Sequence, residues 1–83
     1  MSAIDVSVII PVKRLNENVE RTISALEKGS YNKYEIIVVV DQKSSQKFSK
    51  TTLMVCFEGP AEKRDEGGRR AKGNVLAFVD DDA

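Results

Sequence analysis

The hydrophobic residues of this 83-residue chain gather in four short runs that polar stretches separate. The runs are Val6–Ile10, Ile36–Val40, Leu53–Phe57 and Val75–Val79. Each run holds five residues, which is too few for a helix, so each predicts a buried strand. The second run contains only β-branched side chains and has no polar face. Such a run is typical of a strand that helices cover on both sides.

The segment between the first two runs predicts a helix that begins at Asn16 and ends at Lys28 and Gly29. Its apolar side chains are spaced along one helical face. They are Val19, Ile23 and Leu26. A second helix is predicted over Ala61–Lys72, after Pro60, although its apolar face is thin and Gly67–Gly68 lowers its intrinsic helix propensity. The polar stretch Gln42–Thr52 is predicted to be a loop.

Continuous apolar strands that alternate with helices predict an α/β fold with a Rossmann-like parallel sheet and flanking helices. Right-handed crossovers favour the strand order 3-2-1-4, which places the first strand inside the sheet. At this length the chain is one domain over residues 1–83.

Composition and charge exclude several classes of protein. Lys plus Arg and Asp plus Glu both number 13, so the net charge is zero, which argues against a nucleic-acid binder. No apolar run approaches the length of a transmembrane helix. The chain has no His, so catalysis by a Ser–His or Cys–His pair within it is excluded. Its one cysteine, Cys56, cannot form an internal disulfide and is interpreted as a small core residue.

In a sheet of this kind ligands bind outside the carboxyl ends of the strands, where the strand order reverses. Pro11, Val12, Lys13 and Arg14 follow the first strand, Asp41 follows the second, and Asp80, Asp81 and Asp82 follow the fourth. The topology therefore predicts that four carboxylates and two basic side chains share one edge.

The three consecutive aspartates are a candidate metal site at that edge. Adjacent carboxylates repel one another, and a hard divalent cation bound through oxygen relieves the repulsion. We expect Mg²⁺ or Mn²⁺ there, in contact with the phosphate oxygens of a ligand. The alternative is a solvated turn after a strand.

The ordered set of motifs resembles family-2 glycosyltransferases with the GT-A fold. Val6–Val12, the helix after it and Ile36–Asp41 are similar to the opening of that family. Gly59–Gly67 is similar to its "GPxxARNxG" stretch, and Ala71–Asp82 to its "AxGexiaflDdD" stretch, which contains the DxD motif. The resemblance extends from Val6 to Ala83.

The resemblance implies a nucleotide-binding half of a truncated GT-A fold that takes a UDP- or GDP-linked sugar. Pro11 and Val12 match the loop against the base, and Asp41 matches the acidic residue that binds the base or ribose. Arg64 matches an arginine near the nucleotide, and Asp80 matches the ribose-side member of DxD. Asp82, with Asp81, matches the metal-contacting member.

Two departures from the family bear on the choice of ligand. Many relatives continue Asp41 as "DDGSxD", whereas this chain has Gln42 and Lys43 next, which leaves base and sugar choice open. The family's Asn after the arginine is Asp65 here.

The basic residues also have simpler interpretations. Arg64 would form a surface ion pair with Asp65 or Glu62, and Lys13 and Arg14 would be solvated. The basic residues Lys63, Arg69, Arg70 and Lys72 are predicted to form a solvated helix face.

The sequence therefore predicts the donor-binding part of a glycosyltransferase. We expect this part to be inactive alone, because no acceptor site and no general base can be identified among its residues. We expect those features in residues after Ala83, and a cytoplasmic chain, with membrane association through a further C-terminal part left open. The edge strands Leu53–Phe57 and Val75–Val79 carry no charge, which predicts self-association. Two alternatives are a stand-alone nucleotide- or metal-binding module and a receiver-like domain. The second is disfavoured because Pro11–Lys13 stands where a receiver needs acidic residues.

Overall fold

The structure is a computed structural model that describes residues 3–79 of the chain. Its elements are β1 (Val6–Pro11), α1 (Glu17–Lys28), β2 (Tyr34–Val40), β3 (Thr51–Val55), α2 (Pro60–Arg70) and β4 (Val75–Phe78). The four strands of the described region are all parallel and lie in the order β3-β2-β1-β4. The predicted α/β Rossmann-like sheet and its strand order are confirmed.

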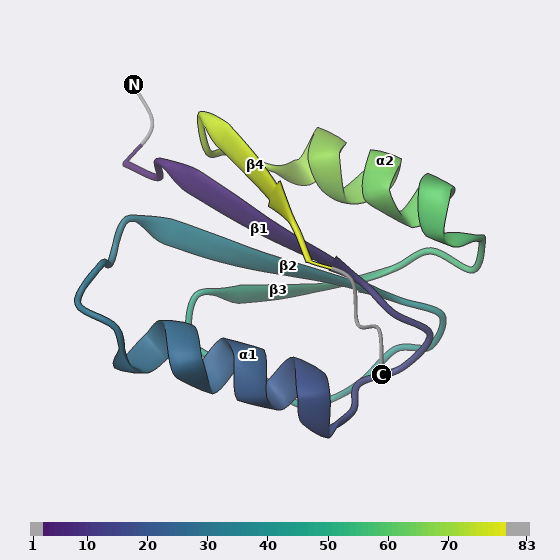
Figure 1. Ribbon diagram of the computed structural model, residues 1–83. Helices are drawn as coiled ribbons and strands as arrows, with labels where there is room; N and C mark the ends of the chain where they lie inside the picture. Colours follow the sequence, from purple (N-terminus) through teal and green to yellow (C-terminus); the bar gives the residue numbers. More distant parts are fainter. Residues whose placement is uncertain (1–2, 80–83) are drawn as a thin grey trace.

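The two helices lie on opposite faces of the sheet, so the molecule has three layers (Figure 1). The buried side chains of β2 alternate between these faces. Ile36, Val38 and Val40 belong to the core cluster on the α1 side, which includes Val19 and Ile23 of that helix. Ile37 and Val39 join Ile9 of β1 in a smaller cluster on the α2 side. The absence of a polar face in β2 follows from this two-sided burial.

Helix α1 begins and ends where its capping residues predict. The side-chain Oδ1 of Asn16 accepts a hydrogen bond from the backbone N–H of Val19 at 3.0 Å. The N–H of Gly29 donates to the carbonyl of Leu26 at 3.2 Å after the last turn. The predicted apolar face lies against the sheet, with Val19 and Ile23 buried and Leu26 half-buried.

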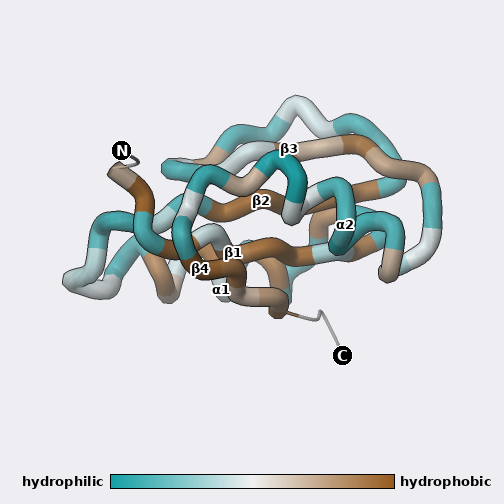
Figure 2. The backbone as a smooth tube through the Cα atoms, turned by 90° about the horizontal axis from the view of Figure 1, so that it is seen from above, coloured by the Kyte–Doolittle hydropathy of each residue, from teal (hydrophilic) through white to brown (hydrophobic). Residues whose placement is uncertain are grey.

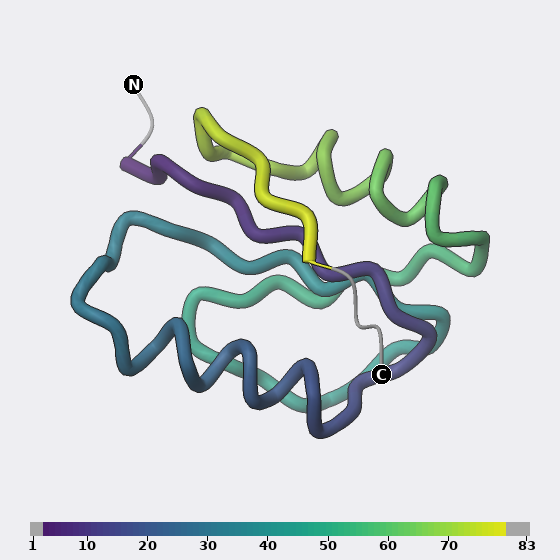
Figure 3. The backbone as a smooth tube through the Cα atoms, in the orientation of Figure 1, coloured from purple at the N-terminus to yellow at the C-terminus, as the bar shows by residue number. Residues whose placement is uncertain are grey.

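The connection from β2 to β3 contains no helix. Residues 41–50 cross the same side of the sheet as α1 (Figure 3), and Phe48 packs against the core there. At its end Lys50 has a left-handed backbone with φ of 58°, and its carbonyl accepts from the N–H of Ile36 at 2.8 Å. The Lys50 ammonium lies 4.7 Å from the centre of the Tyr34 ring. A cation over an aromatic face is a favourable contact, and this one helps to hold the tight entry into β3.

Strand β3 is shifted from its predicted position at Leu53–Phe57. It begins at Thr51 and ends at Val55, because the threonines at its start pair with Ile36 and Ile37 of β2. Threonine is β-branched and suits an edge strand with one free side. Phe57, which the apolar run placed in the strand, lies beyond its end and is 79% exposed. Cys56 is half-buried against the α2-side cluster, as a small core residue would be.

Helix α2 packs closely on the sheet through a glycine. A Cβ atom on Gly67 would lie 2.6 Å from Cγ2 of Ile9 and 3.3 Å from Cγ2 of Val39. Any side chain at this position would therefore push the helix away from Ile9 of β1 and Val39 of β2. The close packing that glycine permits offsets its low helix propensity.

A buried polar cluster fixes the turn that leads into β4. Ser7 is fully buried, and its hydroxyl donates to Oε2 of Glu35 at 2.6 Å and accepts from the N–H of Gly73 at 2.8 Å. The same Glu35 oxygen accepts from the backbone N–H of Lys72 at 2.6 Å. These bonds join β1, β2 and the start of β4 at the amino ends of the strands, away from the edge where the site is predicted.

Strand β4 is an edge strand with little cover. Figure 2 shows that hydrophobic positions follow the strands, while the connecting segments are mostly hydrophilic. In β4 the exposed fractions are 57% for Val75, 42% for Leu76 and 47% for Phe78. The described region holds no helix that is both long and apolar enough to cross a lipid bilayer.

Candidate functional site

The carboxyl ends of β1 and β2 stay paired beyond the strands themselves. The N–H of Val12 donates to the carbonyl of Val39, and the N–H of Asp41 donates to the carbonyl of Lys13, both at 2.9 Å. These bonds hold the loop after β1 and the residue after β2 side by side. The predicted proximity of Pro11, Val12 and Asp41 is thus explained by backbone hydrogen bonds.

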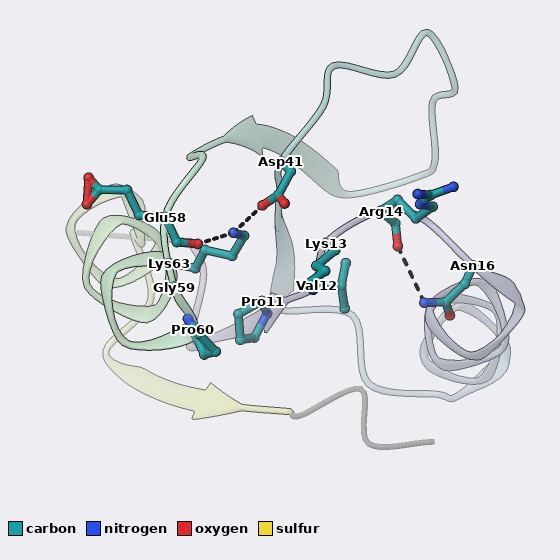
Figure 4. A pocket seen from close by; sticks show the side chains of 10 residues that line it. All are labelled: Pro11, Val12, Lys13, Arg14, Asn16, Asp41, Glu58, Gly59, Pro60 and Lys63. Atoms are coloured by element: carbon teal, nitrogen blue, oxygen red, sulfur yellow. Dashed lines mark hydrogen bonds and ion pairs between the residues drawn. The ribbon is translucent and has the colours of Figure 1, made fainter.

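A pocket of about 390 Å³ opens at this edge, between the strand ends and the start of α2. It is lined by Pro11, Val12, Lys13, Arg14, Asn16, Asp41, Glu58, Gly59, Pro60 and Lys63 (Figure 4). The lining comes from three segments that are far apart in the sequence. The pocket has apolar walls of proline and valine, two carboxylate side chains and three cationic side chains. Such a mixture suits a ligand that has both a flat, uncharged part and an anionic part.

Lys63 is the residue that the sequence interpretation placed wrongly. It was expected on a solvated helix face with Arg69, Arg70 and Lys72, but its side chain is only 5% exposed. Its ammonium Nζ donates to Oδ1 of Asp41 and to the backbone carbonyl of Glu58 (Figure 4). A buried ammonium is costly unless it is paired, and these two acceptors supply the pairing. Arg69 and Arg70 are exposed, as expected.

Two signals in the sequence point to this burial. Lys63 lies near the N-terminus of α2, where the helix dipole disfavours a cation, so a lysine there calls for a carboxylate partner. Lys63 is also four residues before Gly67, on the same helical face. These two residues are the ones that α2 buries against the sheet. The face of α2 that packs on the sheet therefore consists of a glycine and a lysine, which a search for apolar residues does not detect.

The exposed basic residues of the pocket lie on the loop after β1. Lys13 and Arg14 are both exposed, and the carbonyl of Arg14 accepts from the side-chain amide of Asn16 at 3.4 Å. This bond ties the loop to the N-cap of α1 (Figure 4). Because both side chains line the pocket and are exposed to solvent, they lie at its mouth, where cations attract an anionic ligand with little desolvation cost.

The structure does not place the remaining predicted site residues, Arg64 and Asp80–Asp82, in the pocket. Arg64 is half-buried on α2 and is not among the residues that line the pocket. Asp80, Asp81 and Asp82 lie outside the described residues. The last described residue, Val79, continues the pairing of β4 with β1, because its N–H donates to the carbonyl of Ile9 at 2.9 Å. Among residues 3–79 no cluster of three acidic, Cys or His side chains could hold a metal ion.

The comparisons with known proteins agree with the resemblance in the motifs. A family model described as "Glycosyl transferase family 2" matches residues 7–83. A relative in Rickettsia bellii (strain RML369-C), described as an "Uncharacterized glycosyltransferase", is 34% identical over 88 aligned positions. That alignment covers 93% of this chain and 13% of the relative, so the chain spans a small part of the length of the protein it matches.

Proposed function

The chain belongs to glycosyl transferase family 2, and on this premise we propose that it forms the donor-binding part of an enzyme that transfers a sugar from a UDP- or GDP-linked sugar. The observation that carries the proposal is the pocket at the carboxyl ends of β1 and β2, lined by Pro11, Val12 and Asp41. These are three of the five residues that the resemblance assigned to the nucleotide; the other two are Arg64 and Asp80. We assign neither acceptor binding nor the general base to residues of this chain, and a cytoplasmic location stays a prediction.

The pocket offers separate surroundings for the two ends of a nucleotide. Pro11, Val12 and Pro60 give apolar surface for a base, and the carboxylate of Asp41 accepts hydrogen bonds from base or ribose. Lys13 and Arg14 at the mouth provide positive charge for the phosphates. Arg64 is assigned to the nucleotide on the resemblance alone.

The chemistry of the three aspartates fits a divalent cation. Asp81 and Asp82 offer only carboxylate oxygens, the ligands that Mg²⁺ and Mn²⁺ prefer. We assign the cation to these two residues and the ribose to Asp80, as the resemblance implies. When bound, the cation would neutralise charge that develops on the diphosphate leaving group.

Binding of a nucleoside diphosphate is expected to require Mg²⁺ or Mn²⁺. Asp82→Ala should abolish the dependence on metal, because it removes one of the two proposed carboxylate ligands of the cation. Asp41→Asn should weaken nucleoside binding by about tenfold while leaving metal affinity nearly unchanged, because it removes the charge of the acceptor but keeps a side-chain oxygen for the buried Lys63 ammonium. Isothermal titration calorimetry of both variants and of the original chain, with UDP and GDP, measures these effects.

Equal nucleotide affinity with and without metal would contradict the metal assignment. Binding that does not distinguish uridine and guanosine diphosphates from other nucleotides would favour the stand-alone module. Lys47→Asp is the matched control, because Lys47 is exposed in the loop between β2 and β3 and does not line the pocket.

We also propose that copies of the chain associate through β4. Among residues 3–79, β4 is the outermost strand on its side of the sheet, and its exposed Leu76 and Phe78 offer no charge to block pairing with another copy. Zero net charge removes long-range repulsion between copies. Light scattering over a concentration series should show a mass that rises with concentration, and Leu76→Lys should suppress the rise. A monomer at every concentration would contradict this role of the edge.

A further inference from the structure

The ion pair between Lys63 and Asp41 in the pocket indicates a role for Lys63 that the proposed function does not include. We propose that Lys63 is a positioning residue, which fixes the carboxylate of Asp41 so that it can accept a hydrogen bond from the nucleoside part of the ligand. The inference rests on the proposed function, because Asp41 is assigned there to the base or ribose.

The contacts of Lys63 set the direction of both side chains. Its Nζ donates to Oδ1 of Asp41 and to the carbonyl of Glu58, so β2 and the segment before α2 are joined through one ammonium. Because Oδ1 of Asp41 is engaged by the ammonium, we expect Oδ2 to accept the hydrogen bond from a ligand. Asp41 and Lys63 both line the pocket, but the Asp41 side chain is 21% exposed and the Lys63 side chain 5% exposed. The carboxylate is thus the more accessible of the two groups, and the ammonium lies between it and the Glu58 carbonyl (Figure 4).

Burial favours a positioning role for Lys63 over direct binding of phosphate. A phosphate would have to displace Asp41 or the Glu58 carbonyl from the ammonium and lose bonds that are already made in a desolvated place. Lys13 and Arg14 are exposed on the same pocket and need no such exchange. A carboxylate already fixed in one rotamer loses less conformational entropy when a ligand binds.

The test is a binding comparison among four forms of the chain: the original, Lys63→Met, Asp41→Asn and the double variant. Each is titrated with uridine and guanosine, which carry no phosphate, and with UDP and GDP in the presence of Mg²⁺. Lys63→Met keeps much of the length of the side chain and removes the ammonium. We expect it to weaken the nucleoside and its diphosphate by the same factor, about tenfold. The double variant should bind no more weakly than Asp41→Asn alone.

Three results would overturn the inference and leave the proposed function intact. The affinity of Lys63→Met could equal that of the original chain. Its loss could be confined to the diphosphates, which would make Lys63 a phosphate contact. The losses of the two single variants could add in the double variant, which would show that Lys63 acts independently of Asp41. If the original chain bound no nucleoside and no nucleotide, the proposed function and the inference would both fail.

A measurement on the original chain keeps the test decisive if Lys63→Met does not fold, which circular dichroism reveals. A buried, hydrogen-bonded lysine ammonium exchanges its protons slowly enough to be followed by nitrogen-15 NMR. We expect the Lys63 signal to shift as uridine or guanosine saturates the pocket, because a ligand bond to Asp41 alters the charge distribution of the carboxylate that the ammonium binds. A signal that does not move at saturation would overturn the inference.

Discussion

Replacing Val38 by Asp is expected to unfold the chain. Val38 is fully buried on the α1 side of β2, between Ile10 of β1 and Leu53 of β3 in the sheet register. That cluster consists of hydrophobic side chains, and the Lys50 ammonium lies over its member Tyr34, at the start of β2 and four positions before Val38. A buried carboxylate without a partner costs several kcal/mol, which is comparable to the whole stability of a domain of this size. Circular dichroism should show no cooperative melting transition.

Lys47→Asp is the control for this substitution. Lys47 is exposed in the loop between β2 and β3, and exposed substitutions usually change stability by about 0.5 kcal/mol or less. Its melting curve should match that of the original chain. A folded Val38→Asp variant with a similar melting temperature would show that β2 is not the centre of the core.

Gly67→Ala is expected to destabilise the fold, although alanine favours a helix. The added methyl would lie 2.6 Å from Cγ2 of Ile9, which is itself fully buried. Overpacking of this kind costs about 1–3 kcal/mol. Because the gain in helix propensity from Gly to Ala is at most about 1 kcal/mol, the steric cost should prevail.

The neighbouring glycine provides a matched control. A Cβ on Gly68 would lie 3.7 Å from Cδ1 of Leu76, an ordinary contact, so Gly68→Ala should raise stability by about 0.5–1 kcal/mol. Thermal melts should therefore move in opposite directions for the two variants. Each 1 kcal/mol corresponds to about 4–8 °C in a domain of this length. Equal and positive shifts would show that α2 does not pack closely on β1 and β2.

Much of the fold was predictable because both faces of the central strands carry apolar side chains. The run Ile36–Val40 indicated a central strand, and the structure buries all five side chains. The N-cap Asn16 and the spacing of Val19 and Ile23 gave the start and the buried face of α1. These features depend on local pattern and on side-chain volume, which a sequence displays directly.

The rest depended on contacts between distant residues. Thr51 begins β3 two residues before the apolar run, because pairing with β2 outweighs the polarity of an edge residue. Lys63 is buried because Asp41, 22 positions earlier, reaches it across the sheet edge. A lysine on a polar helix looks solvated until the strand topology brings a carboxylate to it.

The candidate site was predicted in part. The topology brought Pro11, Val12 and Asp41 to one pocket because parallel strands end at the same edge. The segment before α2 and the first residue of that helix complete the pocket through Glu58, Gly59 and Pro60, a contribution that the spacing of motifs did not indicate. The roles of Arg64 and of Asp80–Asp82 stay predictions from the resemblance.

We expect this chain to bind a nucleoside diphosphate at the carboxyl edge of its sheet. Nitrogen-15 NMR of the chain, titrated with UDP and then GDP in the presence of Mg²⁺, tests this binding residue by residue. The largest amide shifts are expected at Val12, Lys13, Asp41 and Lys63. Shifts confined to the opposite edge, at Ser7, Glu35 and Gly73, or no shift with either nucleotide, would contradict it.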